Sequence, residues 1–173
     1  MLLSHQTLNS LIKNQKLVEG ENIYVGPASV DLTLDRDFVW PDPLRGGIEF
    51  DKKVRTNEVL DTDVYVLPPF GFVLGSTAEV VNMPVNVSAM IQGRSSVARL
   101  GMQVHCAAGF IDCGFKGKIT LEISNLTQYA MYLPIGKPVC QLICFLQDYA
   151  SERPYDGRYQ GQTQTTSSRF END

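Results

Sequence analysis

The chain has little cysteine, little histidine and no long apolar run. Its 173 residues include four cysteines, two histidines and one tryptophan. The cysteines lie in apolar or strand-like stretches, which favours a reduced, intracellular protein over a secreted protein built on disulfides. The first residues, MLLSHQTLNSLIK, carry a polar residue at every second or third position after the start. We therefore expect neither a signal peptide nor a membrane span, and a cytoplasmic location.

An excess of positive charge is also missing. Fifteen Lys and Arg residues stand against 19 Asp and Glu residues, and the formal net charge is -4. Without a basic surface the protein cannot neutralise the phosphates of a duplex, so nucleic-acid binding is disfavoured. An anionic ligand has to be held by a local cluster of arginines or lysines. With 43% hydrophobic residues, the length fits one domain with a substantial core.

Helical periodicity is confined to the start of the chain, and the rest follows a strand pattern. Ser4 is placed as an N-cap with Leu3 and Leu8 as a hydrophobic staple, and this short helix is expected to end at residues 16–20. The following short β-branched and aromatic runs are VDLTL, VYVLP, FVLGS, EVV, SAMIQ, MQVHC, KITLEIS, MYLP and VCQLICFL. Turn residues separate them, which predicts an antiparallel all-β sandwich or barrel.

Two stretches rich in proline and glycine interrupt this pattern. The first predicts a long irregular excursion and contains Pro41, Pro43, Gly46 and Gly47. The second predicts a tight turn and contains Pro68, Pro69 and Gly71. Neither resembles a domain linker, so residues 1–150 are expected to form a single domain.

The final segment, residues 151–173, contains no Leu, Ile, Val, Met or Ala. It cannot supply an ordinary core strand and is expected to be mobile when alone. Aromatic rings, a guanidinium and an amide occur together at Tyr155, Arg158, Tyr159 and Gln162. This set is suited to stack on a ring and clamp an anion, and an untethered hydrophilic terminus is the alternative.

The densest polar information lies in the middle of the chain. Residues 94–99, RSSVAR, predict a strand that turns into a short helix whose N–H groups and arginines bind an anion; a capped turn with surface arginines is the alternative. In KITLEISN, Glu122 shares a strand face with Thr120 and Ser124. On an exposed face Glu122 is a solvated carboxylate, whereas in a pocket it can act as a general base.

Other polar residues have simpler explanations. Asp112, in FIDCGF, either stabilises a turn or binds a ligand. His105 alternates with apolar residues and is interpreted as a core histidine in a strand, and Cys140 and Cys144 share a strand face and are expected in the core. The H-x-E and P-C-x-x-C motifs of zinc deaminases are absent from the sequence, as are the Walker, GxGxxG and GxSxG motifs.

Five short motifs occur in a characteristic order: PASVDLTL, GRSSVARLG, HCAAGFIDCGFKGKITLE, IGKPVCQL and PYDGRYQGQ. Together they resemble the dCTP deaminase family of the dUTPase-like superfamily, from Pro27 to Arg169. The resemblance implies a homotrimer of distorted β-barrel or jelly-roll subunits with active sites between subunits. It also implies dCTP as substrate, with Mg2+ bound through the nucleotide phosphates, no zinc, and no metal ligand from the chain.

The resemblance assigns roles to individual residues. Glu122 is expected to take a proton from the water that attacks C4 of cytosine, and Ser95 and Arg99 to position that water and restrain the carboxylate. Asp112 is expected to contact the deoxyribose, and the tail to close over the triphosphate. The complete substrate-binding set is Arg94, Ser95, Ser96, Val97, Ala98, Arg99, Ala108, Asp112, Thr120, Leu121, Glu122, Gln141, Tyr155, Arg158 and Gln162.

One branch of this family only deaminates and releases dUTP, whereas another also cleaves the triphosphate to give dUMP and pyrophosphate. Gly109, Phe110 and Gln141 favour the dUMP-forming branch. The alternatives are a monofunctional deaminase, a dUTPase without deaminase activity, and a non-catalytic protein that senses dNTPs.

Three residues depart from the family pattern. Ala107, Cys113 and Arg158 stand where threonine, proline and lysine are usual. The change at Ala107 removes a hydroxyl near the base, and Arg158 keeps the charge but changes the reach of the contact. None of the three removes a presumed catalytic group.

Overall fold

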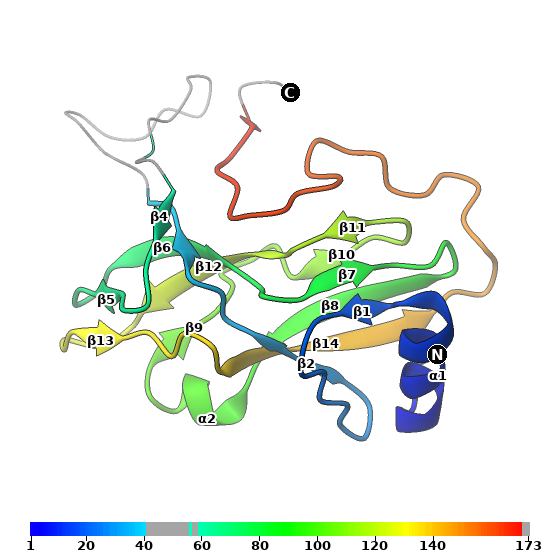
Figure 1. Ribbon diagram of the computed structural model, residues 1–173, viewed down its shortest axis with the longest axis horizontal. Coiled ribbons are helices and arrows are strands. Elements are labelled where there is room, and N and C mark those ends of the chain that lie inside the picture. The colour runs from blue at the N-terminus through cyan, green and yellow to red at the C-terminus, as the bar shows by residue number, and fades with distance from the viewer. Residues whose placement is uncertain (41–55, 57–58, 171–173) are drawn as a thin grey trace.

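Most of the regular structure is β, and its strands are short. The computed structural model describes residues 1–40, 56 and 59–170, so the excursion expected at Pro41, Pro43, Gly46 and Gly47 lies outside the described residues (Figure 1). The elements in chain order are α1 (His5–Gln15), β1 (Val18–Glu19), β2 (Val30–Thr33), β3 (Asp37–Phe38), β4 (Leu60–Asp61), β5 (Val66–Leu67), β6 (Phe72–Ser76), β7 (Val80–Asn82), β8 (Val87–Gly93), α2 (Ser95–Ala98), β9 (Met102–Gln103), β10 (Phe110–Ile111), β11 (Lys116–Gly117), β12 (Thr120–Asn125), β13 (Met131–Tyr132) and β14 (Pro138–Leu146).

Antiparallel pairing joins these strands into sheets. The largest has the order β10-β8-β14-β2, and three-stranded sheets have the orders β6-β12-β9 and β1-β7-β11. Strand β14 crosses the centre of the first sheet and pairs with β8 from Cys140 opposite Gly93 to Leu146 opposite Val87. The neighbours along a sheet are distant in sequence, as expected for a β fold with crossing connections. The prediction of an all-β fold is confirmed.

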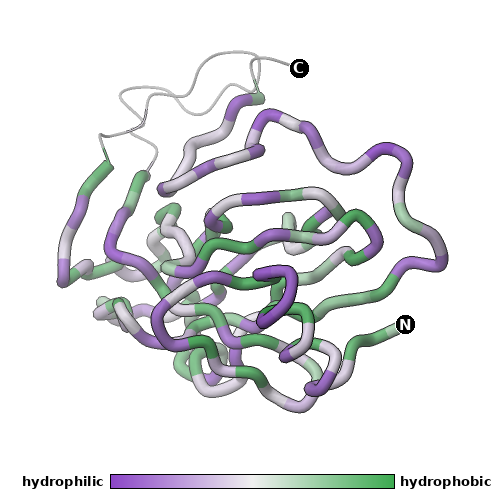
Figure 2. The backbone as a smooth tube through the Cα atoms, turned by 45° about the vertical axis from the view of Figure 1, so that its right-hand side comes forward, coloured by the Kyte–Doolittle hydropathy of each residue, from purple (hydrophilic) through white to green (hydrophobic). Residues whose placement is uncertain are grey.

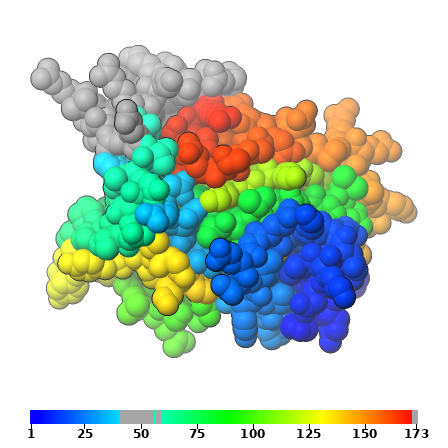
Figure 3. Space-filling view, in the orientation of Figure 1, coloured from blue at the N-terminus to red at the C-terminus, as the bar shows by residue number. Residues whose placement is uncertain are grey.

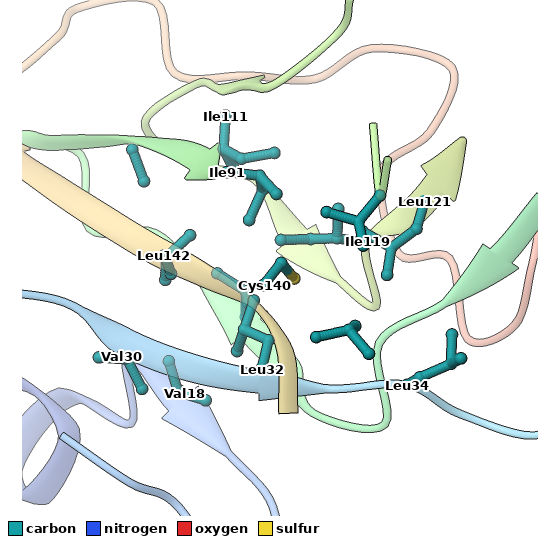
Figure 4. Packing of buried hydrophobic residues seen from close by; sticks show 14 of the residues in the cluster. Val18, Val30, Leu32, Leu34, Ile91, Ile111, Ile119, Leu121, Cys140 and Leu142 are labelled. Atoms are coloured by element: carbon teal, nitrogen blue, oxygen red, sulfur yellow. The ribbon is translucent and has the colours of Figure 1, made fainter. Parts of the chain in front are cut away.

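Alternation along the strands places the apolar side chains in one core. On β14, Cys140, Leu142 and Cys144 are fully buried, while Gln141 between them lies on the other face. Figure 4 shows side chains from β2, β8, β12 and β14 pointing toward one another inside the fold. Cys140 and Cys144 therefore occupy the core positions predicted for them.

The helix and the tight turn also follow the sequence. Ser4 occupies the N-cap position of α1 with extended backbone, although its side chain makes no capping hydrogen bond. Leu3 and Leu8 are both buried, as the staple predicts. At the turn, Gly71 N donates to Pro68 O at 3.0 Å. No helix in the described part of the chain has the length and apolarity to cross a membrane.

The C-terminal segment lies against the barrel although it forms no strand within residues 151–170. It runs over β10 and β11, on the side of the molecule away from α2 (Figure 1). Its trace is predominantly hydrophilic in Figure 2, and Figure 3 shows its atoms packed on the barrel surface. Tyr155 nevertheless packs edge-on against Phe115 at a centroid distance of 5.8 Å, and Thr165 is only 2% exposed. The segment therefore has specific anchors despite its lack of aliphatic residues.

Candidate functional site

A cavity of about 630 Å³ lies between β12, the loop before β10 and the C-terminal segment. We call it the Glu122 cavity. Aromatic side chains form part of its wall, including those of Phe72, Phe110, Phe115 and Tyr159. The predicted site residues that line it are Ala108, Asp112, Thr120, Glu122, Tyr155 and Gln162. A volume of this size, apolar walls and a few polar groups are typical of a small-molecule site.

Glu122 presents a carboxylate whose orientation is fixed by the backbone. Strand β12 buries Leu121 and Ile123 and leaves Glu122 on the half-buried face that borders the cavity. Its Oε2 accepts hydrogen bonds from Cys106 N at 2.9 Å and Ala107 N at 3.3 Å. Both donors use the same oxygen, so Oε1 is the one placed to exchange a proton with a molecule in the cavity.

The tail is held at this cavity by its own barrel. Lys118 N donates to Gln162 O at 2.9 Å, and Gln162 Nε2 donates to Lys118 O at 2.6 Å. Gly117 has a φ of +150°, and a Cβ there would lie 2.7 Å from Gln162 O, so only glycine allows this close approach. Further along, Thr165 N donates to the carboxylate of Asp37, and Thr165 Oγ1 donates to Asp37 O at 2.8 Å.

A second group of predicted residues lies outside the Glu122 cavity. Strand β8 ends at Gly93, and residues 94–99 form the short helix α2 with its two caps, as predicted; none of them is among the described residues that line the cavity. Ser95, Ser96, Ala98 and Arg99 are exposed, whereas Val97 is half-buried against the core. We call residues 94–99 together with Gln141 the arginine surface.

Arg94 and Gln141 meet at one buried carboxylate on this surface. Arg94 Nη2 lies 3.5 Å from Asp31 Oδ2, and Arg94 Nη1 donates to Pro138 O at 3.4 Å. Gln141 Nε2 donates to Asp31 Oδ1 at 3.2 Å and to Ser29 Oγ at 3.1 Å. Because both amide hydrogens are used, Gln141 offers only its Oε1, which suits a hydrogen-bond donor better than a phosphate oxygen.

Several expectations need correction. His105 lies in a loop and is half-buried, not in an apolar core strand, and its Nδ1 is buried without a hydrogen-bond partner among the described residues. The Leu121 side chain is 1% exposed and belongs to the core, so only its backbone can face a ligand. Arg158 does not line the cavity; its Nη1 donates to Arg169 O at 2.8 Å.

Asp112 fits both of its proposed roles. It opens a turn, since Phe115 N donates to Asp112 O at 3.3 Å, and its exposed side chain borders the cavity. The departures from the family pattern lie close by. Ala107 donates its backbone N–H to Glu122. Cys113 is buried, and its backbone carbonyl oxygen accepts from Tyr155 N at 2.8 Å.

Sequence reasoning missed three features of the site. The first is Cys106, which is exposed in the cavity wall beside Glu122. The second and third are the buried carboxylates of Asp31 and Asp37, which hold the arginine surface and the tail. For Asp31 the available signal was a charged residue inside the predicted strand VDLTL, since a buried charge needs a partner, whereas Asp37 lies outside every predicted strand.

The two thiols of β14, Cys140 and Cys144, are buried in the core. Burial raises the pKa of Cys144 to about 12. Burial, with smaller contributions from the charges of Glu79 and Asp31, also raises the pKa of Cys140, so both stay protonated near neutral pH. Across residues 1–40, 56 and 59–170, no three His, Cys, Asp or Glu side chains converge to hold an ion.

The fold is that of the dUTPase-like proteins. The crystal structure of 2'-deoxycytidine 5'-triphosphate deaminase from Agrobacterium tumefaciens superposes with a TM-score of 0.63 at 22% identity, covering 83% of this chain and 48% of that chain. The chain thus spans about half of that protein. The native dUTPase of EIAV gives a TM-score of 0.52 at 21% identity, covering 82% of this chain and 96% of that one.

Residues 2–146 match the family model described as dCTP deaminase-like, and the chain belongs to this family. The dUMP-forming dCTP deaminase of Methanosphaerula palustris is 39% identical, over 98% of this chain and 95% of that protein. That of Beutenbergia cavernae is also 39% identical, over 98% and 94%. These alignments extend over nearly all of the chain, whereas the family model ends before the tail.

Proposed function

We propose that the protein is a dCTP deaminase that converts dCTP and two water molecules to dUMP, ammonia and pyrophosphate. One water replaces the amino group at C4, and the second attacks the α-phosphorus as the bond to the leaving pyrophosphate breaks. The observation that carries this proposal is the Glu122 carboxylate, held by two backbone N–H groups at the wall of a nucleoside-sized cavity. The dUMP-forming relatives at 39% identity support the second, triphosphate-cleaving step.

In the deamination, Glu122 acts as the general base. Its Oε1 takes a proton from the attacking water as the water oxygen bonds to C4 of cytosine. This proton then passes to the amino nitrogen, the C4–N bond breaks and ammonia leaves, and the remaining hydroxyl proton passes to N3 to give uracil. Oε2 stays hydrogen-bonded to Cys106 and Ala107, so the carboxylate keeps one orientation throughout. General base catalysis of this kind contributes about 10²–10⁴-fold.

The complete site is formed between subunits of a homotrimer. One subunit supplies the Glu122 cavity, with Asp112 at the deoxyribose and its own tail, residues 151–173, closing over the triphosphate. The neighbouring subunit supplies the arginine surface, where Arg94, Ser96 and Arg99 bind the triphosphate. Two observations support this: residues 94–99 do not line the cavity, and Leu100 beside them is 74% exposed. A single exposed leucine is common on protein surfaces, so the separation of residues 94–99 from the cavity carries the argument.

Mg2+ is bound mainly through the nucleotide phosphates. Magnesium prefers oxygen ligands and keeps several waters, so triphosphate oxygens and water suffice to hold it. The Oε1 atom of Gln141 is an oxygen suited to accept from a metal-bound water. The ion, when bound, neutralises phosphate charge during the second step. The cytoplasm is the compartment in which we expect the enzyme to work.

Product analysis tests the proposal. Incubation with dCTP and Mg2+, followed by separation of nucleotides, is expected to give dUMP and pyrophosphate. Release of dUTP alone would indicate a monofunctional deaminase. Cleavage of dUTP by both the wild type and Glu122→Gln, with dCTP unchanged, would indicate a dUTPase. Binding of dCTP without any turnover would leave only a sensing role.

A further inference from the structure

We propose that Asp31 is a positioning residue that orients Arg94 toward the triphosphate and holds the Gln141 amide so that its Oε1 faces a hydrogen-bond donor. This inference rests on the proposed function, because it assumes that the arginine surface binds the phosphates. Asp31 would not touch the substrate. It would act through the two side chains that its carboxylate holds.

Strand pairing brings the three residues together. Asp31 on β2 is directly opposite Gln141 on β14, and Gln141 is opposite Gln92 on β8, two residues before Arg94. Directly opposed residues of antiparallel strands have Cβ atoms about 4.5–5.5 Å apart on the same face. The side chains of Asp31 and Gln141 are therefore adjacent because of the sheet register. Burial of the apolar residues on the opposite face of these strands fixes that register.

The burial of Asp31 requires partners that carry charge. It is 5% exposed, although it lies on the face opposite to the core residues Val30 and Leu32. A buried carboxylate is costly unless it is paired and hydrogen-bonded. Gln141 satisfies Oδ1, and the Arg94 guanidinium faces Oδ2. Gln141 donates to Asp31 and would do so equally to a neutral side-chain oxygen. The negative charge of Asp31 is therefore balanced by Arg94.

Arg94 is held along one edge and keeps donors for a ligand. Its Nη1 reaches Pro138 O and its Nη2 faces Asp31, while the side chain remains 36% exposed. A guanidinium carries five N–H donors in a rigid fork, so these two contacts leave others for phosphate oxygens. Fixing the fork before binding reduces the entropy lost when the triphosphate binds.

The charge of Asp31 also has an opposing effect, since it repels phosphates. Arg94 is paired with this carboxylate and is the more exposed of the two side chains, at 36% against 5%, and its positive charge offsets that of Asp31. We therefore expect orientation to outweigh repulsion. Loss of one ordered long side chain corresponds to a roughly 3- to 10-fold loss of affinity.

Asp31→Asn tests the inference, because it keeps the shape and an oxygen for Gln141 but removes the charge that faces Arg94. Glu79→Gln is the matched control: Glu79 is also 5% exposed and accepts from Thr33 N of the same strand at 2.8 Å, but the ion pair of Arg94 is with Asp31. For both variants and the wild type, we would measure kcat and KM for dCTP. Calorimetry would give the affinities for dCTP and for deoxycytidine, which has no phosphate, and thermal unfolding would report stability.

For Asp31→Asn we expect about a 3- to 10-fold increase in KM and in the Kd of dCTP, with kcat within about twofold and deoxycytidine binding unchanged. Glu79→Gln should match the wild type in kcat, in KM and in the affinities for dCTP and deoxycytidine. Unchanged or tighter dCTP binding by Asp31→Asn overturns the inference, as does an equal loss for deoxycytidine. Recovery of the variant at high Mg2+ would instead make Asp31 a metal ligand.

These outcomes separate the inference from the proposed function. If the wild type binds dCTP but does not turn it over, the function fails, and the calorimetric comparison of dCTP with deoxycytidine still decides the role of Asp31. If the wild type is active and Asp31→Asn is indistinguishable from it, only the inference fails.

Discussion

Mixing two inactive variants in one oligomer tests whether each active site takes groups from two subunits. Glu122→Gln disables the cavity, and Arg99→Ala disables the arginine surface. In one chain these two regions are separate, because no residue of 94–99 is among the described residues that line the Glu122 cavity. We expect each variant alone to lose about 10²-fold or more in turnover, as for loss of a general base or of an oriented charge.

The magnitude of recovery follows from cyclic symmetry. In a ring of three, any trimer that contains both variants has one contact at which an intact Glu122 faces an intact Arg99, whether the ratio is 2:1 or 1:2. Mixed trimers should therefore regain about one third of wild-type activity. Coexpression with two affinity tags and tandem purification isolates the mixed trimers, and release of dUMP from dCTP measures their activity.

A control on the same side of the site excludes trivial recovery. Asp112 and Glu122 both line the cavity of one subunit. Trimers that mix Glu122→Gln with Asp112→Ala should stay as inactive as their parents, since no subunit then carries an intact cavity. If mixed trimers of Glu122→Gln and Arg99→Ala also stay inactive, the shared site is refuted.

Three further predictions concern the Glu122 cavity. Glu122→Gln should lower deamination about 10²–10⁴-fold, while calorimetry shows dCTP binding within a fewfold of wild type, because the amide removes the base and keeps the shape. Gly117→Ala should displace the tail, because the added Cβ would lie 2.7 Å from Gln162 O. Faster tryptic cleavage of the tail and a higher KM for dCTP would show this displacement. An unchanged digest would contradict it. Exposed Cys106 should react first with a thiol reagent at pH 8, and dCTP should protect it. Cys144, whose pKa is raised to about 12, should stay unreactive until the pH approaches that value or the fold opens. Prompt labelling of more than one thiol would contradict this.

The alternation of apolar and polar residues predicted the strands, because alternate residues of a strand point to the buried and the exposed face. The alternation around Glu122 and the apolar run of β14 both identified the correct faces. His105 shows the limit of the method: its neighbours Val104 and Cys106 alternate with it like strand residues, yet the chain turns there so that the N–H of Cys106 can reach Glu122. A hydrogen bond between positions 16 residues apart leaves no periodic signal.

Contacts between distant strands were unpredictable for the same reason. Nothing local in VDLTL indicates that Asp31 faces a glutamine 110 positions later, because that pairing depends on the register of β2 against β14. The position of the tail likewise depends on Gly117, whose φ of +150° is a property of the folded strand β11. Resemblance to a family supplied the site residues, but the partners that hold them emerged only from the three-dimensional arrangement.

The distribution of charge gives a reason for dividing the site between subunits. The chain carries a net charge of -4, and a nucleoside triphosphate is itself highly anionic, so binding depends on where the arginines lie and not on the total. A guanidinium that donated a hydrogen bond to Oε1 of Glu122 would occupy the carboxylate oxygen that is proposed to accept the proton. In the proposed trimer, Arg94 beside Asp31 would lie at the phosphate end and Glu122 at the cytosine end, on surfaces that are separate within one chain.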